Sequence, residues 1–574
     1  MRRLLPLSKA LAVAALAVAA PPPAGGEVFV ERAAELGVDF RHDNGMTGRR
    51  YIAEIMGSGL ALFDADGDGD LDLFFVDGGS IEGAESAAGD SGARHRLYRN
   101  ELVSGGAASG ALRFTDVTAA SGIRGAGYGM GVAAGDFDND GRVDLYVTAL
   151  GNTRLWRNFG VDAAGHPRFA DETARARAED RRWSVPAAFV DLDRDGWLDL
   201  FVGNYLRFST AAHVPCRTAA GEPDYCGPVP NDAVPDRLLR NRGDGTFEEV
   251  TARAGLAETF GPALGVIAAD LDDDGWQDLY VGNDGTANQL WINRRDGTFT
   301  DEALLAGCAV SGEGKPQASM GTDAGDYDGD GDVDLIMDNI DGQGLMLYRN
   351  DGGDGFVDVS RPSGLLTPSW SSTGFGTAWI DYDNDSRLDL LVVNGAIRVL
   401  PGQARAGHPL PLRQERQLYR NLGGGRFAAV GEDAGGAFDV AEVGRGAAFG
   451  DLDNDGDTDV VVSNNAGPAR VLINQVGAGR PWLGLRLVTG EPRRDALGAK
   501  VELRRTGAPP LVRLARAAGS YASANDPRVL FGLGEGVSVE AVIVRWPSGR
   551  SERFPPPSLG VYTTLAEGEG EPAP

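Results

Sequence analysis

Short apolar runs alternate with glycine- and aspartate-rich turns along most of the chain, without helical periodicity. A typical unit begins with the Gly/Ala-rich apolar stretch 129–134, passes through an acidic turn, and resumes with the β-branched and aromatic run 145–150. A strand ending in Arg-Asn follows at 155–158, and a glycine-bearing turn then leads to one more short strand. Short runs of this kind, bounded by Asp-Gly turns, are typical of β-strands joined by hairpins. The pattern therefore predicts units of four short antiparallel strands.

The acidic turn occurs seven times as a nine-residue segment with aspartate at positions 1, 3, 5 and 9. The segments begin at residues 64, 136, 191, 270, 326, 381 and 451, and the shortest spacing between them is 55 residues. The longer spacings contain insertions, among them 78–93, 207–235 and 401–416. Repeated four-stranded units are typical of propeller blades. We therefore predict an all-β fold, a seven-bladed β-propeller followed by a small β-rich C-terminal domain.

The two ends of the repeat region complement each other. The seventh repeat lacks its last strand, whereas residues 28–38 have the sequence pattern of that missing strand. We predict that 28–33 supply the outer strand of the seventh blade and close a propeller domain of residues 28–478. Alternating strands such as 482–488, 499–505 and 539–549 predict a separate β domain over 480–566. The acidic, proline-bearing residues 567–574 are predicted to be a disordered tail.

The aspartates of the repeated segment predict a metal site in every unit. Oxygen ligands at alternate residues of a tight loop can converge on one hard cation, and Ca²⁺ takes about six to eight oxygens in a forgiving geometry. We assign the four carboxylates and the backbone carbonyl of position 7 as candidate ligands, and we expect about seven structural Ca²⁺ ions. The candidate residues are Asp64, Asp66, Asp68, Asp70 and Asp72; Asp136, Asp138, Asp140, Arg142 and Asp144; Asp191, Asp193, Asp195, Trp197 and Asp199; Asp270, Asp272, Asp274, Trp276 and Asp278; Asp326, Asp328, Asp330, Asp332 and Asp334; Asp381, Asp383, Asp385, Arg387 and Asp389; and Asp451, Asp453, Asp455, Asp457 and Asp459.

Three other interpretations of the acidic segment fit the sequence less well. An EF-hand needs a bidentate glutamate at position 12 and flanking helices, but position 12 is apolar here, as in Phe75 and Val147. Mg²⁺ is the second choice, because it demands stricter octahedral geometry and retains more of its water. An acidic turn without metal is the third, and seven complete occurrences argue against it. Ser386, which replaces the usual glycine at position 6, makes the sixth site the one that departs from the pattern.

The charge of the chain agrees with this assignment. Its 574 residues include 83 acidic and 54 basic side chains, for a formal net charge of −29. The four shared positions of the seven segments hold 28 of the acidic residues, so that 55 remain against the 54 basic ones. Such acidity repels phosphate and argues against nucleic acid or an anionic membrane surface as a partner.

The N-terminus and the cysteines bear on localisation. Arg2, Arg3 and Lys9 precede the apolar run 11–20, which has the features of a cleavable signal peptide over residues 1–19 and is too short to span a membrane. A retained N-terminal anchor is the alternative. We therefore expect a secreted, periplasmic or cell-surface protein without membrane insertion. A disulfide between Cys216 and Cys226 is permitted in that environment, and Cys308 remains as a buried thiol.

The repeats resemble the FG-GAP/VCBS repeats of integrin-α-type propellers, and in particular the secreted cartilage acidic protein family with its bacterial relatives. The residues that carry the resemblance are the acidic segments, the strands ending in Arg-Asn, the Gly-Asp-Gly-Thr-Phe turns and the Tyr-Cys-Gly-Pro segment 225–228. Residues 519–534 and 544–550 resemble the ASPIC/UnbV domain of the same family. The resemblance implies a secreted, Ca²⁺-binding propeller.

Two classes of function are compatible with these features. The first is an extracellular binding, adhesion or scaffold module whose loops contact a protein or a glycan. The second is a calcium-dependent polysaccharide lyase or hydrolase, for which His42 and His213 are the candidate acid/base residues. No nucleophile elbow, phosphate-binding loop or dinucleotide fingerprint occurs in the sequence. The binding module is therefore preferred.

Overall fold

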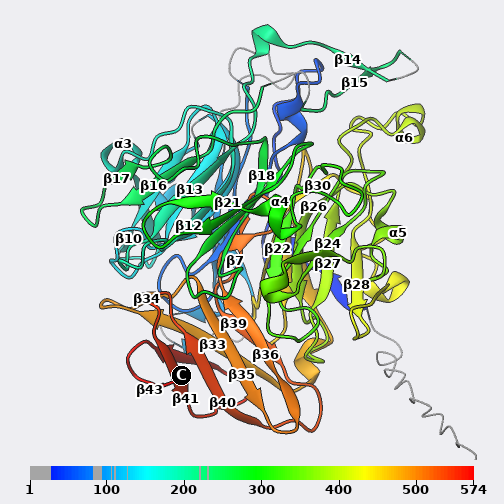
Figure 1. The fold of residues 1–574 in the computed structure, drawn as a ribbon. Helices are drawn as coiled ribbons and strands as arrows, with labels where there is room; N and C mark the ends of the chain where they lie inside the picture. The colour runs from blue at the N-terminus through cyan, green and yellow to red at the C-terminus, as the bar shows by residue number, and fades with distance from the viewer. Residues whose placement is uncertain are drawn as a thin grey trace, which may run out of the picture.

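A computed structural model describes residues 27–81, 94–104, 107–108, 111–125, 127–218, 221–228 and 232–573. The predicted signal peptide, residues 1–19, lies outside this part of the chain. The described residues form an all-β structure in which helices are single turns (Figure 1). The α-helical turns are α1 (Ala33–Leu36), α2 (Thr118–Ser121), α3 (Thr173–Ala176), α4 (Ala303–Ala306), α5 (Leu366–Ser369) and α6 (Pro401–Arg405), and the 3₁₀ turns are η1 (Ile52–Ile55), η2 (Thr210–Ala212), η3 (Gly352–Asp354), η4 (Gly431–Ala434) and η5 (Gly477–Gly479).

Each acidic segment connects the first two strands of an antiparallel sheet, and the described residues contain seven such sheets. In chain order their strands are β2 (Leu60–Phe63), β3 (Asp72–Phe75), β4 (Arg96–Asn100) and β7 (Phe114–Asp116); β8 (Tyr128–Gly135), β9 (Asp144–Leu150), β10 (Arg154–Val161) and β11 (Pro167–Asp171); β12 (Ser184–Val190), β13 (Asp199–Asn204), β16 (Arg237–Asn241) and β17 (Phe247–Glu249); β18 (Ala263–Ala269), β19 (Asp278–Asn283), β20 (Gln289–Asn293) and β21 (Phe299–Asp301); β22 (Thr322–Gly325), β23 (Asp334–Met337), β24 (Met346–Asn350) and β25 (Phe356–Asp358); β26 (Gly374–Ile380), β27 (Asp389–Asn394), β28 (Gln417–Asn421) and β29 (Phe427–Ala429); and β30 (Gly444–Gly450), β31 (Asp459–Asn464) and β32 (Arg470–Asn474).

The fourth strand of the last sheet comes from the start of the repeat region. Strand β1 (Phe29–Glu31) pairs antiparallel with β32, with Phe29 opposite Asn474 and Glu31 opposite Leu472. Two short hairpins lie outside the sheets, β5 (Val103–Ser104) with β6 (Ala107–Ala108), and β14 (Cys216–Arg217) with β15 (Pro223–Asp224).

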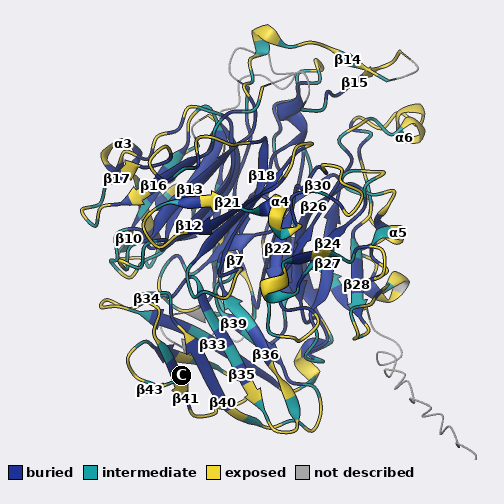
Figure 2. Ribbon diagram, viewed as in Figure 1, coloured by how far each residue is buried: buried dark blue, intermediate teal, exposed yellow. Residues whose placement is uncertain are grey.

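Neighbouring sheets pack face to face through apolar side chains. Phe63 of β2, Leu145 of β9 and Phe189 of β12 belong to one buried cluster. The first strands contact one another in the order β2, β8, β12, β18, β22, β26 and β30, and β30 in turn contacts β2. These strands are buried along their length, whereas exposed residues gather in the connecting loops (Figure 2). Burial on both faces explains why their sequences are rich in glycine, alanine and β-branched residues.

The C-terminal region forms two further sheets around its own apolar core, which includes Leu485, Val501 and Val542 (orange to red in Figure 1). The first sheet contains β33 (Trp482–Thr489), β34 (Arg494–Asp495), β39 (Val529–Gly532) and β42 (Tyr562–Ala566). The second contains β35 (Ala499–Arg505), β36 (Ala508–Ala515), β40 (Val539–Arg545), β41 (Ser551–Phe554) and β43 (Glu571–Pro572).

The prediction of a separate C-terminal domain is wrong in one respect. Strands β37 (Ala518–Gly519) and β38 (Ser523–Ala524) leave that domain and join the first repeat sheet, where Ala524 pairs with Ala61 in parallel. The Val132 N–H also donates to the carbonyl of Ala522 at 3.1 Å. Because the inner edges of the repeat sheets have free backbone groups, the hairpin supplies them with hydrogen-bond partners.

The predicted disorder of residues 567–574 is also wrong for the described part of that tail. Residues Glu571–Pro572 form β43 and pair with β41, with Glu571 opposite Arg553. The Gly568 N–H donates to the Glu552 carboxylate at 3.0 Å. An exposed sheet edge thus orders a segment whose composition alone favours disorder. None of the helical turns in the described ranges has the length and apolar composition that a membrane crossing requires.

Candidate metal centres

The acidic segment folds around its own first aspartate. In the second repeat, the Asp136 carboxylate accepts hydrogen bonds from the N–H groups of Asp140 at 3.1 Å and Gly141 at 2.8 Å. Gly141 has a φ of 83°, a left-handed conformation that glycine adopts without steric cost. Ser386 takes the same place in the sixth repeat with a φ of 82°, and its N–H donates to Asp381 at 2.8 Å. The serine therefore preserves the turn.

Three carboxylates of the acidic segments converge on common points. One oxygen from each lies within 4.8 Å of the other two, an arrangement that could hold a metal ion. Positions 1, 3 and 9 form these groups in four repeats, and positions 1, 3 and 5 form the group in the third repeat. The groups are Asp64, Asp66 and Asp72; Asp136, Asp138 and Asp144; Asp191, Asp193 and Asp195; Asp270, Asp272 and Asp278; and Asp326, Asp328 and Asp334.

Several buried oxygens of these carboxylates have no hydrogen-bond partner among the described residues. They belong to Asp191 and Asp270 at position 1, to Asp138 and Asp453 at position 3, and to Asp389 at position 9. A buried carboxylate oxygen without a donor is costly unless a cation reaches it. The donor set therefore fits a hard divalent cation, and oxygen atoms alone are the ligands that Ca²⁺ takes.

Burial also raises the pKa of the convergent carboxyl groups. Removal from water is the largest cause throughout, and neighbouring aspartates of the same segment raise the values further. The pKa rises to about 6 in Asp64, Asp136, Asp191 and Asp270, to about 7 in Asp451, to about 8 in Asp381 and to about 9 in Asp334. A cation at the centre of each group would favour the ionised form and reverse these shifts.

The aspartate at position 9 has a second, structural role. One of its oxygens accepts the N–H of an asparagine in the third strand of the same sheet, at 2.7–2.8 Å in all seven repeats. In the second repeat, the other Asp144 oxygen accepts the N–H of Phe137 at 3.1 Å. Position 9 therefore fastens the acidic segment to the strands that follow it.

The same asparagines connect each sheet to the preceding one, a role that the sequence analysis missed. Each side-chain amide donates to the carbonyl of position 2 in the preceding acidic segment, at 2.7–3.0 Å. The pairs are Asn100 with Leu452, Asn158 with Ala65, Asn241 with Phe137, Asn293 with Leu192, Asn350 with Leu271, Asn421 with Tyr327, and Asn474 with Tyr382. This chain of contacts, which we call the asparagine ring, returns to its starting sheet. Its signal in the sequence is the asparagine common to every repeat.

Positions 5 and 7 contribute differently from the other predicted ligands. The position-5 carboxylate accepts the N–H of position 7, as in Asp140 with Arg142 at 3.1 Å. It also lies beside the arginine of the third strand, as in Asp140 with Arg157 at 3.0 Å. Position 7 has aspartate, arginine or tryptophan side chains in different repeats. Only its backbone carbonyl is common to all of them, so a ligand from position 7 would be that carbonyl.

Basic side chains of the C-terminal domain contact the acidic segments from one side. Arg494 donates to the carbonyl of Gly196 at 2.7 Å, and Arg528 donates to that of Asp451 at 2.7 Å. Arg505 donates to the hydroxyl of Ser386 at 3.0 Å. The residue that departs from the repeat pattern is thus a contact point for this domain. Docking of the domain and the conformation of the acidic segments are therefore physically linked.

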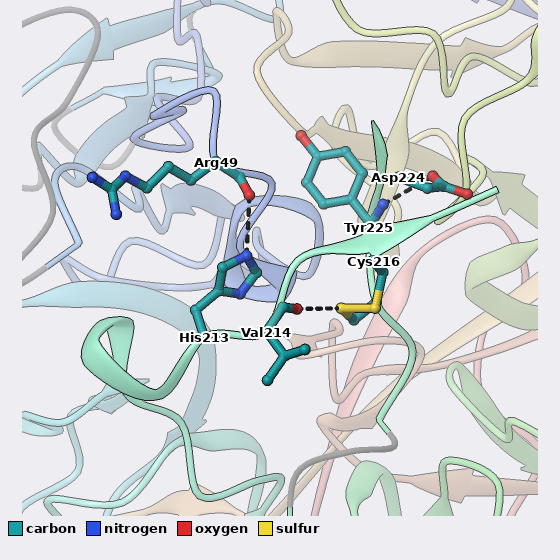
Figure 3. The surroundings of a disulfide bond; sticks show 7 residues. Arg49, His213, Val214, Cys216, Asp224 and Tyr225 are labelled. Carbon is teal, nitrogen blue, oxygen red and sulfur yellow. Dashed lines mark hydrogen bonds between the residues drawn. A yellow bond between two sulfur atoms is a disulfide. The ribbon is translucent and has the colours of Figure 1, made fainter. Parts of the chain in front are cut away.

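The candidate acid/base histidines do not form one site in the described structure. His42 is buried, its Nδ1 accepts the N–H of Ala466 at 3.2 Å, and burial lowers its pKa. His213 is partly exposed, packs edge-on against Tyr51, and contacts the carbonyl of Arg49 at 3.2 Å (Figure 3). The buried, neutral imidazole of His42 and the partly exposed ring of His213 on Tyr51 have separate surroundings and do not make an acid/base pair.

A disulfide between Cys216 and Cys226 closes the insertion that follows β13 (Figure 3). The neighbouring Tyr225 is buried and donates to the Glu54 carboxylate at 3.3 Å. The Asp224 carboxylate accepts the N–H of Val399 at 2.9 Å. The insertion is therefore fastened to two other repeats. Cys308 is a free, buried thiol.

Comparisons with known proteins agree with this organisation. Residues 489–572 match the ASPIC and UnbV family, and residues 221–281, 270–337 and 413–462 match the FG-GAP-like repeat. Cartilage acidic protein 1 of Mus musculus is 26% identical over 517 residues, which cover 86% of this chain and 70% of that protein. The Homo sapiens protein is 27% identical and the Xenopus tropicalis protein 26% identical, over 74% and 77% of this chain. The chain spans 60% and 63% of those two relatives.

Among solved structures, an Agrocybe aegerita lectin described by its recognition of non-reducing terminal N-acetylglucosamine aligns with 72% of this chain and 87% of its own. Its TM-score is 0.38 at 14% identity. A likeness this low supports no conclusion about fold or ligand.

Proposed function

The chain is a homologue of cartilage acidic protein 1 that joins FG-GAP repeats to an ASPIC/UnbV domain, and on that basis we propose that it is a calcium-stabilised, seven-bladed β-propeller acting as an extracellular binding or scaffold module. The observation that carries the propeller is the asparagine ring. Its last contact joins Asn100 of the first repeat to Leu452 of the seventh, over 352 residues of sequence. A ring of packed sheets that also pairs β1 with β32 leaves no sheet edge open at the seam.

In this proposal Ca²⁺ has a structural role. The carboxylates at positions 1, 3 and 9 would hold it, and the position-7 carbonyl would add a ligand. The ion would neutralise carboxylates that burial and mutual repulsion otherwise make hard to ionise. The second oxygen of Asp389 has no hydrogen-bond partner among the residues that the structure describes, and such an ion would satisfy it.

The proposed binding role rests on which surfaces of the described structure remain accessible to a partner. Backbone and side chains of the first strands are buried, and the C-terminal hairpin covers their inner edges. The variable loops and the disulfide-closed insertion are left as the places where a ligand would bind. We propose that the partner is an extracellular protein or a glycan, and that the protein is secreted, periplasmic or on the cell surface. The Cys216–Cys226 disulfide supports that localisation.

Calorimetry tests the proposal. We expect a lower melting temperature in excess chelator than in Ca²⁺, because a ligand that binds only the folded state stabilises it. Titration of the chelator-treated protein should give one Ca²⁺ per acidic segment, with Mg²⁺ as the matched control for charge alone. An unchanged melting temperature, or a stoichiometry near zero, would contradict the structural role of calcium.

A further inference from the structure

A polar cavity of about 440 Å³ lies at the end of the fifth sheet opposite its acidic segment. The acidic segment joins β22 to β23, whereas the cavity is lined by the turn between β23 and β24, by the end of β25, and by residues that precede β22 and β26. The cavity is therefore formed by loops of neighbouring repeats and does not share residues with the metal centre.

Trp370 forms one wall of this cavity with its side chain half exposed. Its backbone is fixed on both sides, since its carbonyl accepts the N–H of Gly342 at 2.8 Å and its N–H donates to the Thr367 carbonyl at 3.4 Å. Exposure of half of the indole ring to water is unfavourable. A ligand that packs on the exposed part of the ring would remove it from water.

Amide and carboxylate groups also line the cavity. The Gln343 side-chain oxygen accepts the N–H of Ala318 at 2.9 Å, and the Asp358 carboxylate accepts the N–H of Gly312 at 2.7 Å. Gln317 is 8% exposed, and its side-chain oxygen has no hydrogen-bond partner among the described residues. That oxygen is closed off from solvent, whereas the partly exposed Gln343 has a side-chain amide that can donate to an oxygen of a ligand.

Charges around the cavity favour an uncharged ligand. Glu313 pairs with Lys315 at 3.0 Å, and the carboxylate of Asp358 is used by the backbone. Only Arg361 adds a cation to the lining, and the whole chain carries a net charge of −29. An acidic polysaccharide would be repelled by that overall field.

From these features we propose that the cavity binds an uncharged saccharide, with Trp370 stacking on the apolar face of a pyranose ring and the Gln343 side-chain amide donating a hydrogen bond to one of its hydroxyl or acetamido groups. A sugar has this combination of one apolar face and many hydroxyls, whereas a peptide in such a groove needs several apolar anchors or an open strand edge. The inference rests on the proposed function as an extracellular binding module, and it names the ligand class for one of its loop surfaces.

The test uses isothermal titration of the full chain in Ca²⁺ with chitotriose, cellotriose and trigalacturonate. We expect binding of at least one uncharged trisaccharide and none of trigalacturonate. Trp370→Ala should weaken that binding about tenfold or abolish it, whereas Trp370→Phe should retain part of it. Phe260→Ala is the matched control, because Phe260 is also exposed, at 42%, and does not line the cavity.

Calcium-dependent melting of each variant separates the two proposals. Variants that melt as the wild type does show that any loss of binding belongs to the cavity and not to the propeller or its calcium. Absence of binding by both uncharged sugars, equal affinities for Trp370→Ala and Phe260→Ala, or a preference for trigalacturonate would each overturn the saccharide assignment. Selection of a peptide from a random library, with its binding lost in Trp370→Ala and no sugar bound, would overturn it in favour of a peptide.

Discussion

The hydroxyl of Tyr521 donates a hydrogen bond to the backbone carbonyl of Met56 at 2.7 Å, where both residues are buried. Tyr521 comes from the C-terminal hairpin, and Met56 follows the turn η1 near the start of the chain. The Tyr521 ring packs edge-on against Phe375, and the guanidinium of Arg445 lies 3.9 Å from the centre of the same phenyl ring. Segments from both ends of the sequence thus meet between the inner strands of the repeat sheets.

Truncation of Tyr521 should therefore uncouple the C-terminal domain from the repeats. For Tyr521→Ala we expect a loss of about 3–5 kcal/mol from the removed ring and the cavity it leaves, and for Tyr521→Phe a loss of about 1 kcal/mol from the hydrogen bond. Differential scanning calorimetry should show one transition for the wild type and two for Tyr521→Ala. Leu559→Ala, at an exposed leucine of the same domain, is the control, and an unsplit transition in Tyr521→Ala would contradict the coupling.

Single substitutions should remove single calcium ions. Asp136→Asn replaces a carboxylate of the second group with a neutral amide, so the titration should show one Ca²⁺ fewer and the melting temperature in Ca²⁺ should fall. In excess chelator the melting temperatures of Asp136→Asn and the wild type should be nearly equal. Asp244→Asn is the matched control, since the exposed Asp244 carboxylate accepts hydrogen bonds from Thr246 within a simple turn. An unchanged stoichiometry in Asp136→Asn would remove Asp136 from the ligand set.

The asparagine ring predicts that replacing one of its uncharged asparagines lowers the stability of the protein substantially. Asn241→Ala leaves the carbonyls of Phe137 and Leu198 without their donor, and each buried unpaired group costs about 1–3 kcal/mol. We expect Asn241→Ala to lower the melting temperature with and without Ca²⁺. Asn152→Ala, at an exposed position, should change it little. Equal melting temperatures for the two variants would show that the ring contributes no stability.

Asp338 predicts a stability that depends on pH. Its carboxyl is fully buried, neither oxygen has a partner among the described residues, and burial raises its pKa well above the usual value. The folded state thus favours the protonated acid, so this group's contribution to stability is full below about pH 4, the unfolded pKa, and is lost as pH rises toward the folded one.

Asp338→Asn removes that loss while keeping the shape of the side chain. We expect its melting temperature to match the wild type near pH 4 and to exceed it by about 2 °C or more at neutral pH. Asp341→Asn serves as the control, because Asp341 is a nearby aspartate that is exposed. A melting temperature below that of the wild type at neutral pH would show that the ionised carboxylate is needed.

Local features of this structure could be predicted from the sequence, because they are set within one repeat. The acidic segments and the strands that flank them depend on spacing and side-chain type over short distances. The outer strand near Phe29 could be predicted, although its partner Asn474 is distant, because it has the pattern that the seventh repeat lacks. The roles of Asn100 and of the hairpin at Ala524 could not be predicted in this way. Their partners, Leu452 and Ala61, lie hundreds of residues away. The sequence pattern around Asn100 and in residues 517–526 does not show which distant residue each of them contacts.

The position of the Tyr521 hairpin also sets the order of events during synthesis. A nascent chain that has left the ribosome only as far as the sixth repeat lacks the carbonyl of Leu452 for Asn100 and the strand partner for β1. Even a complete set of repeats lacks Ala522 and Ala524 at its inner edges. Apolar faces and unpaired backbone therefore stay exposed until residues 518–524 emerge, and a partly synthesised chain is open to aggregation until then.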